Sequence, residues 1–216
     1  WAIEQGILLS NTQVHKGEEF PDTSDFDLLI ILGGRMGAYE EDDYPWMIGE
    51  KAFIKRAIAE NKYVLGLCLG AQILADVLGG LVHPHVYNEV GWWPVHFSSQ
   101  IEGTLLQGLP EMVHLFEFHG DTFTLPAGAK ILASSAGCEN QAFIYNDRVL
   151  AVQFHPEVSF EKMKVLAEAV GNVEGPYSQP VVHYMNEQAY FEQSKEVMFT
   201  ILCNFKEQIK LAEVML

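Results

Sequence analysis

The sequence is poor in cysteine and in basic residues. Its three cysteines, Cys68, Cys138 and Cys203, lie far apart, so they form neither a disulfide framework nor a metal-ligand spacing. A reducing cytoplasm fits this use of cysteine best. Only 13 residues are basic against 29 acidic ones, and the formal charge of −16 would repel nucleic acid and anionic lipid. We therefore expect neither nucleic acid nor a membrane among the partners.

Long apolar runs are also missing. The longest, near residues 27–32 and 63–69, are far shorter than the roughly 20 residues of a membrane span, and no basic-then-apolar leader opens the chain. We expect a soluble, cytoplasmic protein. The 216 residues, 49% of them hydrophobic, suffice for one large domain, and no repeat or Pro/Ser-rich linker divides them. We expect residues 1–216 to form a single domain.

Strand and helix patterns alternate in the first half of the chain. The apolar runs 27–32 and 63–67 are typical of strands covered on both faces, and a shorter strand is expected around Val14. Residues 46–60 and 69–78 carry apolar side chains at helical intervals, the second stretch ending at two glycines. This alternation predicts an α/β fold with a mainly parallel sheet flanked by helices.

The second half begins with a different texture. Residues 81–151 form short alternating runs broken by glycine, proline and asparagine, which predicts strands and turns. These strands would be a small antiparallel addition to the parallel sheet. Residues 160–171 and 187–210 return to helical spacing.

Cys68 stands between two glycines, in Gly66-Leu67-Cys68-Leu69-Gly70, where a predicted strand becomes a helix. Such a tight turn lifts one side chain clear of the sheet and leaves the next backbone N–H free, as in a nucleophile elbow. The positive end of the helix favours an anion, so we expect the thiol to ionise readily. The alternative is a buried structural cysteine, a common use of this residue.

A histidine and a carboxylate follow the apolar run 149–154, in His155-Pro156-Glu157. Strand ends are where parallel sheets present active groups. His155 can take the thiol proton and return it to a leaving group, while Glu157 can bind the other ring nitrogen and fix its orientation. A purely structural turn is the alternative, which the presence of Cys68 disfavours. We interpret the three residues as a Cys-His-Glu triad.

Together these motifs resemble the class I, triad-type glutamine amidotransferases, and most closely their stand-alone, GMP-synthase-like branch. Cys, His and Glu occur in the family's order, and the resemblance extends from about residue 25 to residue 158. The fold it implies is flavodoxin-like. The segments that carry it are 33–34, 39–46, 66–72, 118–121 and 154–158.

The resemblance implies cleavage of the glutamine γ-amide to glutamate and ammonia, through a γ-glutamyl thioester on Cys68. The family's oxyanion donors correspond to the backbone N–H groups of Gly34 and Leu69. Its glutamine pocket corresponds to Gln72 and to the backbone of Gly120 and Asp121. For Gln72 alone, an amide on the helix surface is the alternative.

We expect no cofactor and no metal. The sequence has no phosphate-binding loop, and His83 and His85 lack a third ligand at a suitable spacing. No synthetase module fits in 216 residues. If the ammonia is used productively, its acceptor must therefore be a separate synthetase chain.

Two features depart from the family's pattern. Arg35 stands where proline usually follows the double glycine, so the loop is expected to be looser, or Arg35 aims a cation at a substrate carboxylate. The family also has a first strand and the start of a helix ahead of the position of Trp1. We expect either that the chain is trimmed there or that its order of elements is unusual.

Two other functions remain open at this point. The same triad would serve a hydrolase of γ-glutamyl peptides or conjugates, which release an amine instead of ammonia. A catalytically silent binding or regulatory subunit would keep the fold without the chemistry. The intact Cys68, His155 and Glu157 count against the second of these.

Overall fold

A computed structural model describes residues 1–214 and contains one mixed sheet of eight strands. The strand order is β1-β2-β7-β6-β5-β3-β4, and β8 pairs with β3. The strands are β1 (Leu28–Ile31), β2 (Tyr63–Leu67), β3 (Val82–Phe97), β4 (Met112–Phe123), β5 (Lys130–Ser135), β6 (Ala142–Tyr145), β7 (Val149–Val152) and β8 (Tyr177–Ser178). The α-helices are α1 (Trp46–Ala59), α2 (Leu69–Val77), α3 (Phe160–Val170), α4 (Val181–Tyr184) and α5 (Gln188–Val214).

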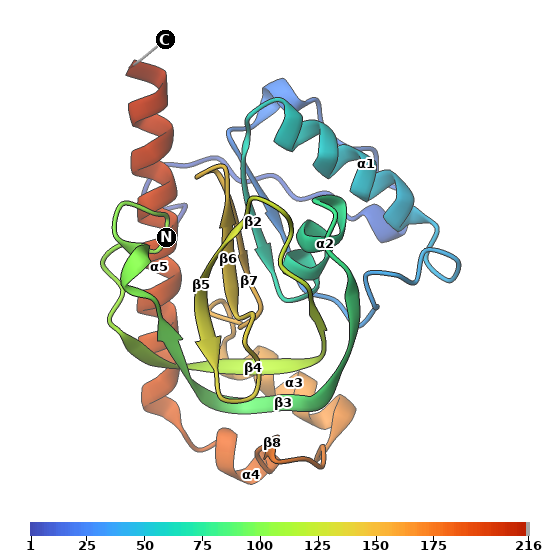
Figure 1. Ribbon diagram of the computed structural model, residues 1–216, viewed down its shortest axis with the longest axis vertical. Helices are drawn as coiled ribbons and strands as arrows, with labels where there is room; N and C mark the ends of the chain where they lie inside the picture. The colour runs from blue at the N-terminus through green and yellow to red at the C-terminus, as the bar shows by residue number, and fades with distance from the viewer. Residues whose placement is uncertain (215–216) are drawn as a thin grey trace.

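Strands β1, β2 and β7 are parallel and form the core of the layered part. Helices α1 and α2 cover one face, and the long helix α5 runs along the other (Figure 1). Successive residues of β2 point to opposite faces, so Val64 packs in the cluster of α1 and α2, whereas Leu65 packs against α5. This two-sided burial explains why β2 is apolar at every position.

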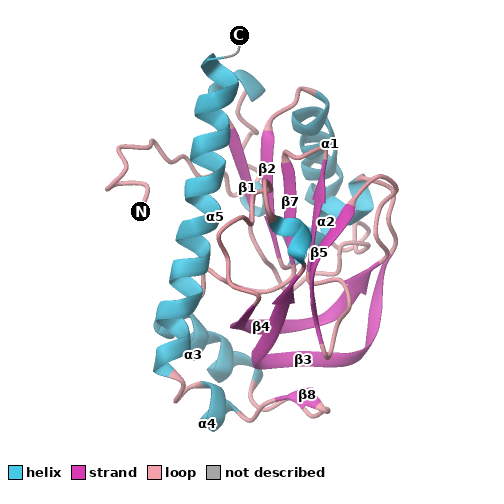
Figure 2. Ribbon diagram, turned by 60° about the vertical axis from the view of Figure 1, so that its left-hand side comes forward, coloured by secondary structure: helices cyan, strands magenta, loops and turns pink. Residues whose placement is uncertain are grey.

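Beyond β7 the sheet is antiparallel, through β6, β5, β3 and β4. The long strands β3 and β4 form a curved pair that crosses the end of the parallel strands, beside α3 and α4 (Figure 2). Trp92 and Phe116 fill a third core cluster there, with Tyr184 of α4. The α/β class is therefore confirmed, while the antiparallel part is larger than the small addition expected.

The strand expected around Val14 is wrong. Residues Val14–Lys16 form one turn of 3₁₀-helix, closed by hydrogen bonds from Lys16 N–H to Gln13 O (2.9 Å) and from Gly17 N–H to Val14 O (3.0 Å). A strand requires a neighbour that satisfies its backbone groups, and here the local turn satisfies them instead. Among the described strands, β1 pairs only with β2. No helix in residues 1–214 is both long and apolar enough to cross a membrane.

Two glycines allow β2, α2 and β1 to approach closely. A Cβ atom on Gly66 would lie 2.5 Å from the carbonyl oxygen of Gly70, and one on Gly70 would lie 2.3 Å from that of Ile31. Both obstacles are backbone atoms, which cannot rotate away. The glycines that flank Cys68 are therefore required by the packing of α2 on the sheet.

Gly70→Ala is expected to lower the free energy of unfolding by about 3 kcal/mol or more, because the added methyl group forces α2 away from β1. Denaturant unfolding followed by circular dichroism measures this. Gly49→Ala in α1 is the matched control, since its methyl group would meet only a phenylalanine ring at an ordinary 3.5 Å. Equal unfolding midpoints for the two variants would contradict the close approach.

Candidate active site

Cys68 occupies the turn between β2 and α2 with a backbone conformation that L-residues rarely adopt. Its φ is 51° and its ψ is −108°. The N–H of Cys68 donates to Val152 O of the neighbouring β7 at 2.9 Å, which ties the turn to the sheet. Strained backbone of this kind persists where surrounding structure enforces it, and it clusters at functional sites. The side chain is 6% exposed, and its Sγ lies 3.9 Å from Phe118 O.

His155 and Glu157 follow β7 and are held in place by three elements. The N–H of His155 donates to Phe116 O of β4 at 2.8 Å, and Ser194 Oγ of α5 lies 3.4 Å from His155 O. His155 Nδ1 lies 2.7 Å from Glu157 Oε1. A carboxylate only accepts hydrogen bonds, so Nδ1 carries the proton and Nε2 is left for the thiol.

Cys68 and His155 meet beside Gly33. A Cβ atom on Gly33 would lie 3.3 Å from His155 Cε1 and 3.5 Å from Cys68 Cβ, so a larger residue would wedge against both. Burial opposes a charge on His155. The negative charges of Cys68 and Glu157 and their hydrogen bonds outweigh it, so the pKa of His155 lies well above its ordinary value. The environment thus favours a thiolate–imidazolium pair.

The two expected oxyanion donors flank this pair. Gly34 lies in the loop after β1, and Leu69 is the first residue of α2, where backbone N–H groups have no partner within the helix. Within residues 1–214 neither N–H donates to a loop carbonyl or to a side chain. Both groups are therefore available to a substrate oxygen.

The expected pocket residues lie together at the start of α2 and the end of β4. Gln72 is 4% exposed, so it is not an amide on the helix surface. Its Nε2 donates to Asp121 O at 3.3 Å and to Gln153 Oε1 at 3.1 Å. A Cβ atom on Gly120 would lie 2.6 Å from Asn88 Oδ1, so β3 and β4 approach closely there.

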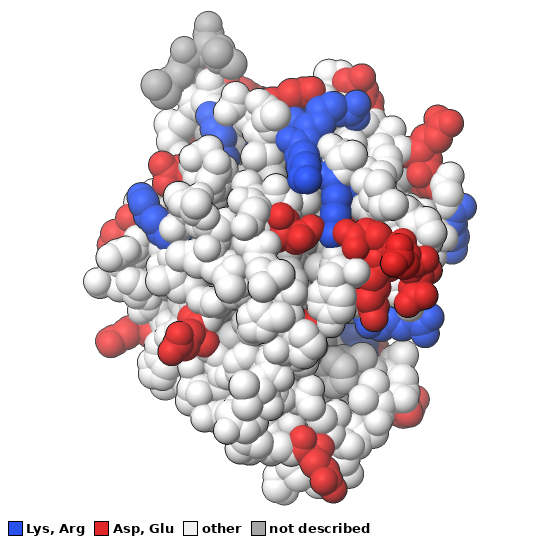
Figure 3. Space-filling model, turned by 45° about the vertical axis from the view of Figure 1, so that its right-hand side comes forward, with Lys and Arg blue, Asp and Glu red and all other residues white. Residues whose placement is uncertain are grey.

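The loop after β1, which carries Gly34, is anchored more firmly than the sequence suggested. The buried amino group of Lys51 in α1 donates to Ala38 O at 2.6 Å and pairs with Glu41 and with Asp76, the latter at 2.7 Å. Glu41 belongs to the acidic run 40–43, expected to be a solvated turn. Arg35 itself is exposed. On the face in Figure 3, basic side chains form short groups flanked by acidic ones.

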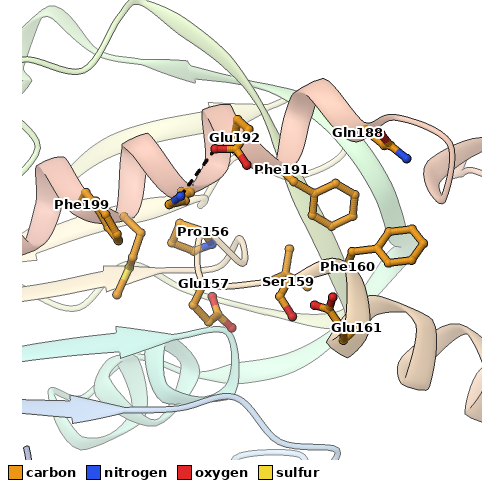
Figure 4. A pocket seen from close by; sticks show the side chains of 12 residues that line it. Pro156, Glu157, Ser159, Phe160, Glu161, Gln188, Phe191, Glu192 and Phe199 are labelled. Carbon is orange, nitrogen blue, oxygen red and sulfur yellow. Dashed lines mark ion pairs between the residues drawn. The ribbon is translucent and has the colours of Figure 1, made fainter. Parts of the chain in front are cut away.

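A groove of about 590 Å³ lies behind the triad, between the 156–161 segment and α5. Figure 4 shows Glu157 at one side of it, with the rings of Phe160 and Phe191 at the other. Cys68 is not among its lining residues. The groove therefore adjoins the carboxylate of the triad and does not lead to the thiol.

Sequence reasoning missed a buried cluster beneath the pocket, formed by Glu89 of β3 and by Glu117 and His119 of β4. Their ligand atoms lie within 4.8 Å of one another, which is metal-ligand spacing. Both ring nitrogens of His119, however, face acceptors and so act as donors, which leaves no lone pair for a metal. The signal in the sequence was a lone acid in an otherwise apolar strand, at Phe116-Glu117-Phe118.

The comparison with known families agrees with this geometry. The sequence pattern of the family described as glutamine amidotransferase class-I matches residues 5–169. A putative glutamine amidotransferase-like protein of Salmonella typhimurium, YfeJ, is 29% identical over 173 residues, which are 78% of this chain and 72% of the relative. A GMP synthase (glutamine-hydrolyzing) subunit of Sulfurisphaera tokodaii is 42% identical over 136 residues, 62% of this chain and 69% of the relative.

Solved structures show the same relationship. A glutamine amidotransferase of Methylobacillus flagellatus superposes with a TM-score of 0.87 at 25% identity, over 95% of this chain and 86% of that one. One from Thermotoga maritima has a TM-score of 0.78 at 29% identity, over 96% of this chain and 89% of that one. With a strand-to-helix cysteine, a matching sequence pattern and a shared fold, the chain belongs to the class I glutamine amidotransferase family.

Proposed function

We propose that residues 1–216 act as a single amidotransferase domain that hydrolyses the γ-amide of glutamine, with Cys68 as nucleophile. The observation that carries the proposal is the strained turn at Cys68, beside a histidine whose Nδ1 lies 2.7 Å from Glu157 Oε1. A positive φ at a cysteine that begins a helix is costly, and nothing in its hydrogen bonding to the sheet requires a thiol. A structural cysteine would gain nothing from this conformation.

In the first half of the reaction, the Cys68 thiolate attacks the γ-carbonyl carbon and the carbonyl oxygen becomes an oxyanion. The N–H groups of Gly34 and Leu69 donate to this oxyanion. His155 gives its Nε2 proton to the amide nitrogen, the C–N bond breaks, and ammonia leaves a γ-glutamyl thioester on Cys68.

In the second half, water attacks the thioester carbonyl and His155 Nε2 takes a proton from that water. The tetrahedral intermediate then expels the Cys68 thiolate, and glutamate is released. Glu157 keeps the imidazole in the tautomer and orientation that both proton transfers need. No cofactor takes part in either half.

The ammonia formed here requires an acceptor if it is to be used. The similarity to proteins named as glutamine-hydrolyzing subunits of GMP synthase favours delivery to a synthetase on a separate chain, because such a subunit is one component of a larger enzyme. We propose that this domain is cytoplasmic and works with such a partner.

Treatment with a glutamine-like chloroketone tests the nucleophile and the pocket together. Mass spectrometry is expected to find one adduct, on Cys68, and none in the Cys68→Ser variant, because only a thiolate next to a glutamine pocket reacts quickly at neutral pH. Labelling of Cys203, which is exposed, would indicate unselective reaction. An unlabelled Cys68 would favour a silent binding subunit.

Comparing substrates separates glutamine hydrolysis from γ-glutamyl conjugate hydrolysis. Release of ammonia from glutamine is measured beside release of the amine from γ-glutamyl dipeptides. Efficient turnover of the dipeptides alone would overturn the assignment of glutamine as substrate.

A further inference from the structure

The imidazole of His119 is a fully buried cation between two acids. Its Nδ1 lies 3.0 Å from Asp121 O, and its Nε2 lies 3.2 Å from Glu89 Oε2 and 3.4 Å from Glu117 Oε2. A backbone carbonyl and a carboxylate only accept, so both ring nitrogens carry protons. Although burial disfavours the charge, the hydrogen bonds and charges of Glu117 and Glu89 raise the pKa of His119 well above its ordinary value.

The two acids that hold His119 have unequal surroundings. Glu89 also accepts hydrogen bonds from Ser135 Oγ (2.6 Å) and from Gln141 Nε2 (2.8 Å), so its carboxylate is well satisfied. Within residues 1–214, Glu117 has only the 3.4 Å contact with His119. A fully buried carboxylate with so few donors is costly to ionise. Glu117 is therefore the member that takes up a proton.

The charged groups that face Glu117 come from three elements. They are Glu89 of β3, His119 of β4 and His155 of the loop after β7, and the thiol of Cys138 faces His119. Burial raises the pKa of Glu117 to about 7, with a contribution from the charge of Glu89, against the two histidines. Its proton is thus exchanged in the pH range where the enzyme would work.

The position of the cluster links it to the site. Strand β4 places Phe116 O on the N–H of His155 and Phe118 O beside the Cys68 thiol. Asp121 O accepts from His119 on one side and from Gln72 on the other. The cluster therefore fixes the stretch of β4 from which both the triad and the glutamine pocket are supported.

We propose that His119 is a positioning residue, clamped as a cation between Glu89 and Glu117, that holds the Asp121 carbonyl at the glutamine pocket. We further propose that Glu117 gains and loses a proton near neutral pH and so couples this clamp to the charge on His155. The inference rests on the proposed function for its kinetic consequences. The clamp itself is a property of the unliganded protein and is tested without activity.

The first test is the thermal stability of Glu117→Gln against pH, with Glu111→Gln at an exposed site of the same chain segment as control. A carboxyl whose pKa is raised on folding stabilises the protein below its unfolded value, and this stability is lost as pH rises through the folded value. The wild type is therefore expected to lose Tm relative to Glu117→Gln between about pH 4.5 and pH 7. A difference that does not change with pH would overturn the assignment of the proton to Glu117.

The second test is the pH profile of Cys68 labelling by the chloroketone. Above pH 7 the ionised Glu117 supports the positive charge on His155, so its removal is expected to move the alkaline limb of the labelling rate to lower pH by about one unit. Glu111→Gln should leave this limb in place. Unchanged limbs in both variants would overturn the coupling, even with Cys68 fully reactive.

The role of His119 is tested with His119→Gln, which cannot donate to the Asp121 carbonyl and to both acids at once. The KM for glutamine is expected to rise about tenfold with a smaller change in kcat, as for the loss of one charged hydrogen bond in the pocket. An equal fall in kcat and no change in KM would contradict a positioning role. A stoichiometric metal ion in the purified wild-type protein would overturn the cationic clamp itself.

Discussion

Replacing Cys68 by alanine is expected to lower kcat for glutamine hydrolysis by about 10⁴-fold or more, because no other group can form the thioester. Ammonia release, followed by a coupled assay, measures this loss. The Cys68→Ala variant should keep its fold, since alanine fits the buried turn and the close contacts belong to Gly66 and Gly70. KM should change little, since the pocket is formed by other residues.

Cys203→Ala is the matched control for this experiment. Cys203 is an exposed cysteine of α5, and its removal should leave kcat within about twofold of the wild type, as for surface substitutions away from a site. A Cys68→Ala variant with a substantial fraction of wild-type activity would show that the amide is attacked by another group, such as a bound water.

Replacing His155 by alanine is expected to lower kcat by about 10²–10⁴-fold, because the leaving nitrogen and the attacking water both lose their proton partner. His183→Ala, at an exposed position of α4, serves as the control for removal of an imidazole. The same ammonia assay applies, over a range of pH.

The double variant Cys68→Ala/His155→Ala separates a triad from two independent contributions. Residues that act as one unit are not additive, so the double variant should be no slower than the Cys68→Ala variant. If the two losses multiplied, Cys68 and His155 would act in different steps. That result would remove the proton transfer between them from the mechanism.

Local patterns were enough to predict the triad and the parallel part of the fold. Continuous apolar runs predicted β1 and β2, because a strand buried on both faces can tolerate few polar residues. Glycines on each side of Cys68 predicted a turn from strand to helix, and the structure has α2 begin at the next residue. The signal was strong there because chemistry and backbone geometry both constrain the same five positions.

Patterns failed where neighbours decide the outcome. The segment around Val14 has strand-like residues, but within the described structure it forms a local turn instead of pairing with a strand. The extent of β3 and β4 also escaped prediction. Proline and glycine interrupt the pattern of β3, yet pairing with β4 carries the strand through both.

The sequence by itself determined which groups perform the chemistry, because a thiol, an imidazole and a carboxylate at strand ends are defined by residue type and by the local turn. Only the tertiary structure decided what lies beneath them. Glu89 and His119 are 30 positions apart in sequence, and the pairing of β3 with β4 places them side by side. Burial then sets their charges, since the cost of ionising Glu117 depends on water being excluded from every direction.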